Sequence, residues 1–278
     1  MRESKSWLEA CARMFGLTTL GLSAGAISAA LGGAYYATYS VRSQWLGRTD
    51  WHGHEGSSSV ALTFDDGPSA DTDLILNALR AQNVQATFFM VGRNVELHPQ
   101  VARRVIAEGH EIGNHSYSHP IYLFRSPHET RRQLRKAQEV ITETTGVRPR
   151  FARPPCGVRT PAYFAAAREL ELRTVQWSVA GFDWKHIGAS EIAHNVLKDV
   201  RAGSIILLHD GDSALKRDMI QTVRSLSIII KGLRKRGLSV VPLSQLLNCK
   251  AGEVFPAAKE KSGVRKVSRI TTDTLHRF

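Results

Sequence analysis

The sequence predicts an α/β protein in which seven parallel strands form a distorted (β/α)7 barrel. Three observations support this prediction. Strand-like and helix-like segments alternate along the chain, polar clusters follow the strand-like runs, and 278 residues with 42% hydrophobic side chains can bury one large core. Regular alternation indicates βα units and therefore a parallel sheet. Seven strands favour an incomplete or distorted barrel over an open doubly wound sheet, which remains the alternative.

Each expected strand is a short run of apolar and β-prone residues that is bounded by turn residues. These runs are 60–64, 86–90, 111–114, 150–152, 173–177, 204–208 and 239–242. The helical patterns between them cover 71–82, 99–108, 128–145, 161–170, 190–200 and 219–236. No internal repeat is visible, so one main domain is expected.

The N-terminal segment 1–40 is expected to be a signal or membrane anchor. No charged residue occurs between Arg13 and Arg42, and an apolar helix over 14–39 would exceed the roughly 30 Å needed to cross the core of a bilayer. The small residues at 24–26 resemble a cleavage site, so an anchor and a cleaved signal both stay open, with a buried core helix as a third option. We therefore expect an exported protein that is either anchored at the cell surface or periplasm, or secreted.

Composition divides the rest of the chain into three parts. Residues 41–58 are polar and rich in Gly and Ser, which is typical of a linker; His52 and His54 could bind a metal there, but a solvated loop fits this composition better. Residues 59–247 carry the alternating pattern and form the expected catalytic domain. Residues 248–278 are charged and aperiodic, which predicts a loosely ordered basic tail.

The formal charge of +12 does not indicate a nucleic-acid partner. The excess is spread along the chain, and no zinc finger, aromatic stacking signature or basic helical repeat accompanies it. Attraction to anionic cell walls or lipid headgroups explains the charge more simply. Cys11, Cys156 and Cys249 form neither a zinc pattern nor a disulfide framework. We expect a monomer.

The first candidate site residues lie where the first strand ends. The apolar run 60–64 passes directly into Asp65, Asp66, Gly67 and Pro68. Neighbouring strand residues point to opposite faces, so two adjacent acids can serve one site only where the chain leaves the sheet, and these acids lie at that point. Adjacent carboxylates repel, which favours separate tasks, one acid held by a cation and the other available as a base. A turn with two solvated acids is the alternative.

Two histidines follow the third expected strand. His115 and His119 are four residues apart, a spacing that can bring both imidazoles to one ion on a helical turn or in a tight loop. Two neutral histidines and one carboxylate can form a facial triad with open positions for water and substrate, and Asp66 is the obvious third ligand. Capping or solvated histidines are the alternative for the pair alone.

Three further polar groups follow expected strands: Arg153, Asp183 with Trp184, and His209. Each could by itself be an ordinary surface or core residue. Because barrel enzymes build their sites at the carboxyl ends of the strands, the shared placement of all these groups indicates one active site.

Together these residues resemble the polysaccharide deacetylase family, the carbohydrate esterases that include chitooligosaccharide and peptidoglycan deacetylases. The motifs are Thr-Phe-Asp-Asp-Gly at 63–67, His-Ser-x-x-His at 115–119, Arg-Pro-Pro-x-Gly at 153–157, Phe-Asp-Trp at 182–184 and Leu-Leu-His-Asp at 207–210. Five motifs in the right order make the resemblance specific, and it covers roughly residues 59–247. It implies a distorted (β/α) barrel, in agreement with the strand count.

The resemblance also implies a metal site and a base. Asp66, His115 and His119 would ligate a divalent ion, most commonly Zn²⁺, with Co²⁺ or another divalent ion as the alternative. Asp65 would be the general base, and Arg153 would orient it.

On the other side of the reacting bond, the resemblance implies that His209 is the general acid and that the carboxylate of Asp183 adjusts the pKa of His209. Trp184, Pro155 and Leu207 would contribute to substrate binding.

Two positions depart from the family pattern. Cys156 stands where an aromatic residue is usual, so the pocket would lose an aromatic wall, while the backbone N–H of Cys156 would still stabilise the oxyanion. Ala180 stands where an acid is frequent, which leaves substrate positioning open.

The implied activity is metal-dependent removal of N-acetyl groups from an N-acetylglucosamine-containing glycan such as peptidoglycan or chitin. O-deacetylation of xylan or a similar glycan is one alternative, and a weakly active glycan-binding domain is another. A site of two histidines and one carboxylate also suits iron oxygenases, but these would not need Asp65 and His209 beside the ion.

Overall fold

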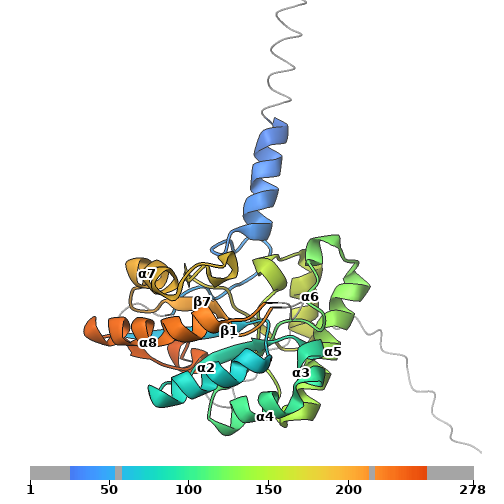
Figure 1. Ribbon diagram of the computed structural model, residues 1–278. Coiled ribbons are helices and arrows are strands. Elements are labelled where there is room, and N and C mark those ends of the chain that lie inside the picture. Colours follow the sequence, from blue (N-terminus) through green and yellow to red (C-terminus); the bar gives the residue numbers. More distant parts are fainter. Residues whose placement is uncertain (1–25, 54–57, 213–216, 249–278) are drawn as a thin grey trace, which may run out of the picture.

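The computed structural model describes residues 26–53, 58–212 and 217–248. In these ranges, short parallel strands lie at the centre and helices surround them (Figure 1). The strands are β1 (Ser59–Asp65), β2 (Thr87–Met90), β3 (Glu111–Asn114), β4 (Phe151–Ala152), β5 (Arg173–Thr174), β6 (Val179–Ala180), β7 (Ile205–His209) and β8 (Ser239–Val240). The α-helices are α2 (Ala70–Ala81), α3 (Gly92–Leu97), α4 (Pro99–Ala107), α5 (Pro127–Thr145), α6 (Pro161–Glu169), α7 (Ala189–Asp199), α8 (Ile220–Lys235) and α9 (Leu243–Leu246). The 3₁₀ helices are η1 (Tyr122–Phe124), η2 (Pro155–Gly157) and η3 (Asp183–Lys185).

The sheet is a curled half-barrel, which confirms the predicted α/β fold class. Its order is β5-β4-β3-β2-β1-β7-β6, β8 pairs with the start of β1, and all these pairs are parallel. In parallel strands the carboxyl ends meet at one edge of the sheet. The register therefore places Asp65, at the end of β1, directly beside His209, at the end of β7.

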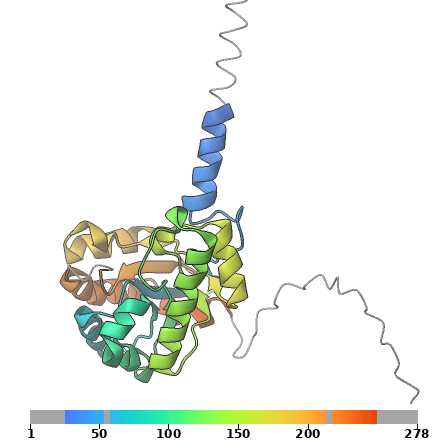
Figure 2. The same ribbon diagram turned by 90° about the vertical axis from the view of Figure 1, so that its right-hand side faces the viewer.

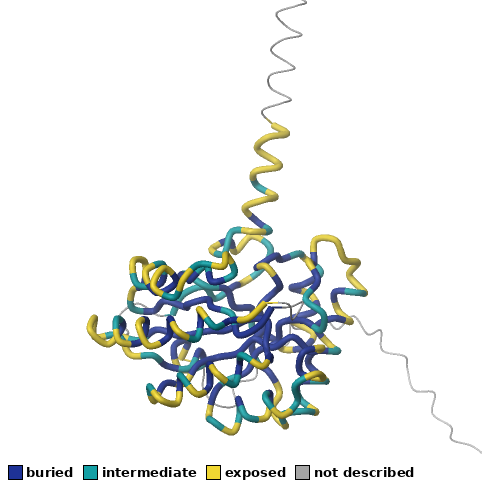
Figure 3. Tube along the Cα trace, in the orientation of Figure 1, coloured by how far each residue is buried: buried dark blue, intermediate teal, exposed yellow. Residues whose placement is uncertain are grey.

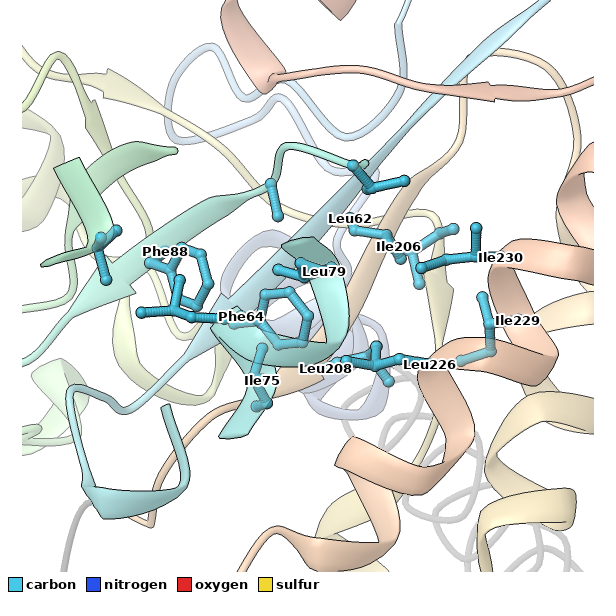
Figure 4. Packing of buried hydrophobic residues seen from close by; sticks show 14 of the residues in the cluster. Leu62, Phe64, Ile75, Leu79, Phe88, Ile206, Leu208, Leu226, Ile229 and Ile230 are labelled. Carbon is cyan, nitrogen blue, oxygen red and sulfur yellow. The ribbon is translucent and has the colours of Figure 1, made fainter. Parts of the chain in front are cut away.

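The core has two layers because successive side chains of a strand point to opposite faces. In β1, Leu62 and Phe64 pack outward against the surrounding helices, and Phe64 stacks on Phe88 of β2 (Figure 4). Ala61 points the other way, into a smaller cluster inside the barrel that Leu243 of α9 helps to fill. Burial of both faces explains why β1 reads as a continuous apolar run.

Local capping fixes where the helices begin and end. Ser69 caps α2 with a capping box, in which the side chain of Thr72 also accepts a bond from the Ser69 N–H. Ser126 caps α5, and Gly146 ends it in the left-handed conformation (φ 74°) that glycine adopts at low cost. These signals explain why the predicted limits of both helices agree closely with the structure.

The N-terminal part of the described chain forms a helix over 26–39 that stands out from the domain (Figures 1 and 2). Most of its residues are exposed (Figure 3). In the described part of the chain, no helix is both long enough and apolar enough to span a bilayer. Residues 1–25 of the expected signal or anchor, and almost all of the expected basic tail, lie outside the described residues.

Residues 41–53 of the expected linker lie against the catalytic domain. The N–H of Asp50 donates to Thr174 O of β5, and its carbonyl accepts from Gln176. Two residues later, His52 bridges to Ser204, next to β7, and is half-buried. This segment therefore connects the edge strand β5 with β7, and His52 packs against the barrel. His54 lies outside the described residues.

The short elements differ from the sequence-based expectation. β6 and the short helices α3 and α9 were not predicted, and the strand expected over 173–177 ends at Thr174. These elements are too short for a periodic pattern to identify them. The strand pairing adds β6 beside β7, so within the described residues the sheet contains eight short strands instead of seven.

Candidate functional site

Three side chains from two strand ends converge in a cluster that can hold a metal ion. One ligand atom from each of Asp66, His115 and His119 lies within 4.8 Å of the others. The Nε2 atoms of His115 and His119 are 3.4 Å and 3.1 Å from the same oxygen, Oδ1 of Asp66. The predicted ligand set is thus brought together, with two nitrogens and one oxygen facing a common point.

The protonation of His115 indicates that a cation fits this point. Its Nδ1 lies 2.7 Å from the backbone carbonyl of Arg153, so Nδ1 carries the hydrogen and donates it. In the neutral ring, Nε2 then has a lone pair that faces the carboxylates of Asp65 and Asp66. Electron pairs that face one another at such distances require a proton or a metal ion between them. The hydrogen bond from Nδ1 to a carbonyl is also the usual support of a metal-binding histidine.

The electrostatics of the cluster agree with this interpretation. Burial opposes ionisation of Asp66, but hydrogen bonds and charge from His115 and His119 hold its pKa well below the usual value. Burial likewise opposes a charged imidazole, yet the carboxylates of Asp65 and Asp66 raise the pKa of His115. The site favours an ionised Asp66 and a positive charge beside it.

The turn that carries Asp66 is held from two sides. The side chain of Asn94 donates to Asp66 O at 2.7 Å, and Asp210 accepts from the N–H of Gly67 at 3.0 Å. A Cβ atom at Gly67 would lie 1.9 Å from Oδ2 of Asp210, so only glycine fits beside that carboxylate. Thr72 of α2 donates to the same Oδ2 at 2.7 Å. These contacts fix the direction of the Asp66 side chain.

Asp65 has a different partner, the fully buried guanidinium of Arg153. Nη1 of Arg153 donates to Oδ1 of Asp65 at 2.7 Å and to Thr63 at 2.8 Å, while Nη2 donates to Gln176 O at 3.0 Å. The guanidinium also lies over the ring of Phe89. Arg153 therefore holds one carboxylate oxygen of Asp65, and the other oxygen, Oδ2, lies 3.7 Å from Nε2 of His115.

His209 and Asp183 form the pair that the sequence predicted. Nδ1 of His209 donates to Asp183 Oδ1 at 2.9 Å, and the backbone N–H of His209 donates to Oδ2 at 2.8 Å. Thr222 of α8 donates to the same Oδ2 at 2.9 Å. Burial lowers the tendency of His209 to be charged, but Asp183 outweighs this effect and raises the pKa of His209 to about 9. A cation in the neighbouring cluster would lower that pKa again.

These groups line one cavity of about 350 Å³. Its walls contain Asp65, Asp66, His115, His119, Cys156, Gly157, Trp177, Trp184, Leu207, His209, Asp212 and Arg217. Two predicted residues act from behind this surface, because Arg153 and Asp183 are buried beneath Asp65 and His209. Pro155 is buried in η2 and lies outside the lining, so the prediction that it contacts substrate is not supported by its position.

The turn of Cys156 is strained. This residue has φ 55° and ψ 16°, the left-handed conformation that side chains other than Gly, Asn and Asp seldom adopt. Cys156 is exposed at the cavity. Partial burial of the thiol and, to a smaller extent, the negative charges of Asp66 and Asp65 raise its pKa. The thiol therefore stays protonated at neutral pH and is a poor nucleophile.

Sequence reasoning missed three residues of the cavity wall: Trp177, Asp212 and Arg217. Arg217 donates to Asp212 at 3.0 Å and to the carbonyl of Trp184 at 3.1 Å, which connects this wall to η3. Trp177 is the last residue of the strand expected over 173–177, and its place at a carboxyl end was a signal for it. Asp212 and Arg217 belong to no motif with a recognisable spacing in the sequence.

The comparisons with known proteins agree with this geometry. The model of the family described as polysaccharide deacetylase matches residues 52–175. The chain is 39% identical over 195 residues to a peptidoglycan-N-acetylglucosamine deacetylase of Bacillus cereus, covering 70% of each chain. It is also 39% identical over 208 residues to a chitooligosaccharide deacetylase of a Bradyrhizobium species, covering 69% of this chain and 91% of that protein.

Solved structures show the same similarity. The crystal structure of the Bc1960 peptidoglycan N-acetylglucosamine deacetylase, bound to an N-hydroxybenzamide compound, superposes with a TM-score of 0.69 at 38% identity, covering 72% of this chain and 92% of that one. A family 4 carbohydrate esterase from Streptomyces lividans in complex with acetate gives a TM-score of 0.61 at 29% identity, covering 66% and 92%.

Proposed function

Because this chain belongs to the polysaccharide deacetylase family, we propose that it removes N-acetyl groups from a glycan that contains N-acetylglucosamine, such as peptidoglycan or a chitin-like polymer. The observation that supports this most strongly is the arrangement of one cavity. A cation site of Asp66, His115 and His119 lies between a carboxylate, Asp65, and an imidazole, His209. Hydrolysis of an amide needs such a proton acceptor and proton donor at one carbonyl.

Asp66, His115 and His119 would hold the divalent ion, with Zn²⁺ as the first choice and Co²⁺ as an alternative, because two imidazoles and one carboxylate suit these metals. When bound, such an ion polarises a carbonyl oxygen and lowers the pKa of a water from 15.7 to about 7.

Asp65 is the proposed general base. Arg153 holds its Oδ1 at 2.7 Å, so Oδ2 stays directed at the cation cluster. A water that attacks the acetyl carbonyl can give its proton to this oxygen.

His209 is the proposed general acid, which protonates the amine as it leaves and so releases acetate. Asp183 fixes Nδ1, so Nε2 is the atom that delivers the proton. The ring of Trp184 lies edge-on to His209 at 5.3 Å and limits its rotation. The backbone N–H of Cys156, in its left-handed turn, is the proposed donor to the oxyanion; one such donor contributes about 3 to 4 kcal/mol in enzymes where this was measured.

We further propose that the protein is exported and that segment 14–39 anchors it in a membrane. Peptidoglycan, which the name of the Bacillus cereus relative gives as its substrate, lies outside the cytoplasm, and 14–39 carries no charged residue. All groups of the site come from one chain, so a monomer is sufficient.

The test of this function is acetate release from a panel of acetylated glycans. We expect release from peptidoglycan and from chitin oligomers, loss of it after chelation, and recovery with Zn²⁺ or Co²⁺. Acetylated xylan serves as the comparison substrate at the same enzyme concentration. Faster release from xylan would overturn the N-acetyl assignment, and binding without any release from metal-loaded protein would indicate a glycan-binding domain.

A further inference from the structure

The end of the helix over 26–39 is hydrogen-bonded to the active-site face of the domain. Its last carbonyls are bound by Arg159, a side chain that is only 1% exposed. The Arg159 N–H donates to Thr38 O at 3.2 Å, and Nη2 donates to Ser40 O at 2.5 Å. Arg159 comes directly after the loop that places Cys156 and Gly157 in the cavity wall. The end of the helix is therefore fixed on the loop that borders the catalytic cavity.

Exposed apolar side chains are concentrated in two segments of the described chain. The first is the helix and the turn after it, and the second is η1 with the residue before it. Their exposed large apolar residues are Ile27, Leu31, Tyr35, Tyr36, Tyr39 and Trp45, and Ile121, Leu123 and Phe124. Phe124 is 73% exposed and Trp45 is 70% exposed, the two largest values among the exposed large apolar residues. Clusters of this kind mark interaction sites in soluble domains.

Both segments pack on α6 and lie at the same end of the domain. Tyr122 of η1 is 5.3 Å from the ring of Tyr163, which in turn contacts Phe164. Phe164 packs so closely on Gly47 that a Cβ there would lie 2.5 Å from its ring. The segments follow or contact loops at the carboxyl ends of the strands, and Figure 2 shows the start of α5 at the same end as the protruding helix. This end is the catalytic face.

The composition of these segments matches a bilayer surface. The sequence at 14–25, which precedes the described helix, contains no charged residue, so the uncharged stretch extends from 14 to 39. Tyr and Trp are the residues preferred at the level of the lipid headgroups. Exposed arginines come directly after the apolar groups, namely Arg42 and Arg48 after the helix and Arg125 after Phe124, where they can reach anionic headgroups.

We propose that the catalytic face lies at the membrane surface, with Leu123 and Phe124 of η1 as a second lipid contact beside the anchor helix. The substrate is then a glycan held close to the bilayer, because His119 is only three residues before Tyr122 and belongs to the cation cluster. This inference rests on the proposed function and the proposed anchor. The inference adds how the domain is oriented on the membrane and where the domain binds its substrate.

Photo-crosslinking in vesicles tests the orientation. Full-length protein is reconstituted into vesicles that contain anionic lipid, with p-benzoylphenylalanine in place of Leu31, Phe124 or Val147 in three separate proteins. Val147 is the matched control, because it is exposed and follows the far end of α5. We expect lipid adducts at 31 and at 124, with an order of magnitude less at 147.

Any other crosslinking result would contradict the proposed orientation. Adducts at 31 without adducts at 124 would place the domain away from the bilayer. Equal adducts at 124 and 147 would show that no face is preferred. Adducts of position 124 with a second copy of the chain would assign the patch to a dimer, and the absence of adducts at 31 would remove the anchor itself.

The proposed location of the substrate is tested by comparing activity on a free substrate and on the same substrate coupled to lipid. The same acetylated chitin oligomer is offered free in solution or coupled to a lipid of the enzyme's own vesicles, at equal total concentration. We expect acetate release to be several-fold faster from the coupled form, and Phe124→Ser to remove most of this preference while Val147→Ser keeps it. Equal rates would refute the proposed substrate location. Crosslinking needs no turnover, so absence of release from both displays would refute the activity and not the orientation.

Discussion

Asp65 and Asp66 are adjacent in the chain, but their different contacts suit the different roles proposed for them. Asp66 faces two imidazoles, whereas Asp65 is bound by the guanidinium of Arg153. The sheet register adds the third group, because Asp65 is the β-sheet neighbour of His209. The proposed cation site, base and acid therefore lie together at the carboxyl ends of β1, β3 and β7.

Asp65→Asn should separate catalysis from metal binding. The amide can still accept from Arg153 but cannot take a proton, so we expect kcat for acetate release to fall by about 10² to 10⁴. Metal content, measured by elemental analysis, should stay near that of the native chain. Asp66→Asn is the matched variant and should lose metal together with activity. Nearly full activity in Asp65→Asn would rule out this residue as the base.

Asp183→Asn should move the alkaline limb of the pH profile. The general acid proposed at His209 has to be protonated, so its contribution persists below the pKa of His209 and disappears as the pH rises through that pKa. The carboxylate of Asp183 is the main cause of the raised pKa of about 9, and its removal should shift the alkaline limb of kcat to lower pH. Titration of the imidazole by NMR gives a direct second measurement. An unchanged limb would show that His209 does not control this step.

At the scale of elements, the long segments were predictable and the short ones were not. The apolar run of β1 and the capped helices α2 and α5 carry strong local signals, and the structure agrees with them to within one or two residues. β6 consists of Val179 and Ala180 alone and exists because it pairs with β7. No local pattern of two residues can indicate such a strand, since its partner is remote in the sequence.

The same contrast applies to the active site. Asp66, His115 and His119 belong to compact motifs with a ligand spacing, so they could be found from sequence. Asp212 and Arg217 could not, because no motif marks them and their place in the cavity wall depends on tertiary contacts of Arg217 with Asp212 and the carbonyl of Trp184. The buried position of Pro155 was also beyond the reach of sequence, since a proline in a turn can face either side.

Arg159→Met should loosen the connection between the protruding helix and the domain. It removes a charged donor from the carbonyls of Thr38 and Ser40, and we expect the free energy of unfolding to fall by about 1 to 3 kcal/mol. Hydrogen exchange should become faster in the amides at 36–40. Arg168→Met, at an exposed position of α6, is the control. Unchanged exchange in this segment would mean that Arg159 does not hold the helix.

At the scale of the whole molecule, the core and the cation cluster should contribute separately to stability. The apolar layers on both sides of the sheet do not involve the cluster, so the metal-free chain should stay folded. Free metal at 100 times its Kd would add about 2.7 kcal/mol, which for a domain of this size raises Tm by roughly 5 to 10 °C. Calorimetry before and after chelation measures this, and His115→Ala should abolish the response to metal. Complete unfolding on chelation would contradict the separation.

The bridging segment at Asp50 and His52 determines where the chain can be shortened. A truncated protein that starts at β1 would look complete, because every catalytic motif follows that point. It would nevertheless leave the backbone groups of Thr174 and Gln176 without their partner Asp50, and so would open an unprotected strand edge at β5. Such a fragment should self-associate during expression, whereas one that begins upstream of Thr49 should remain monodisperse.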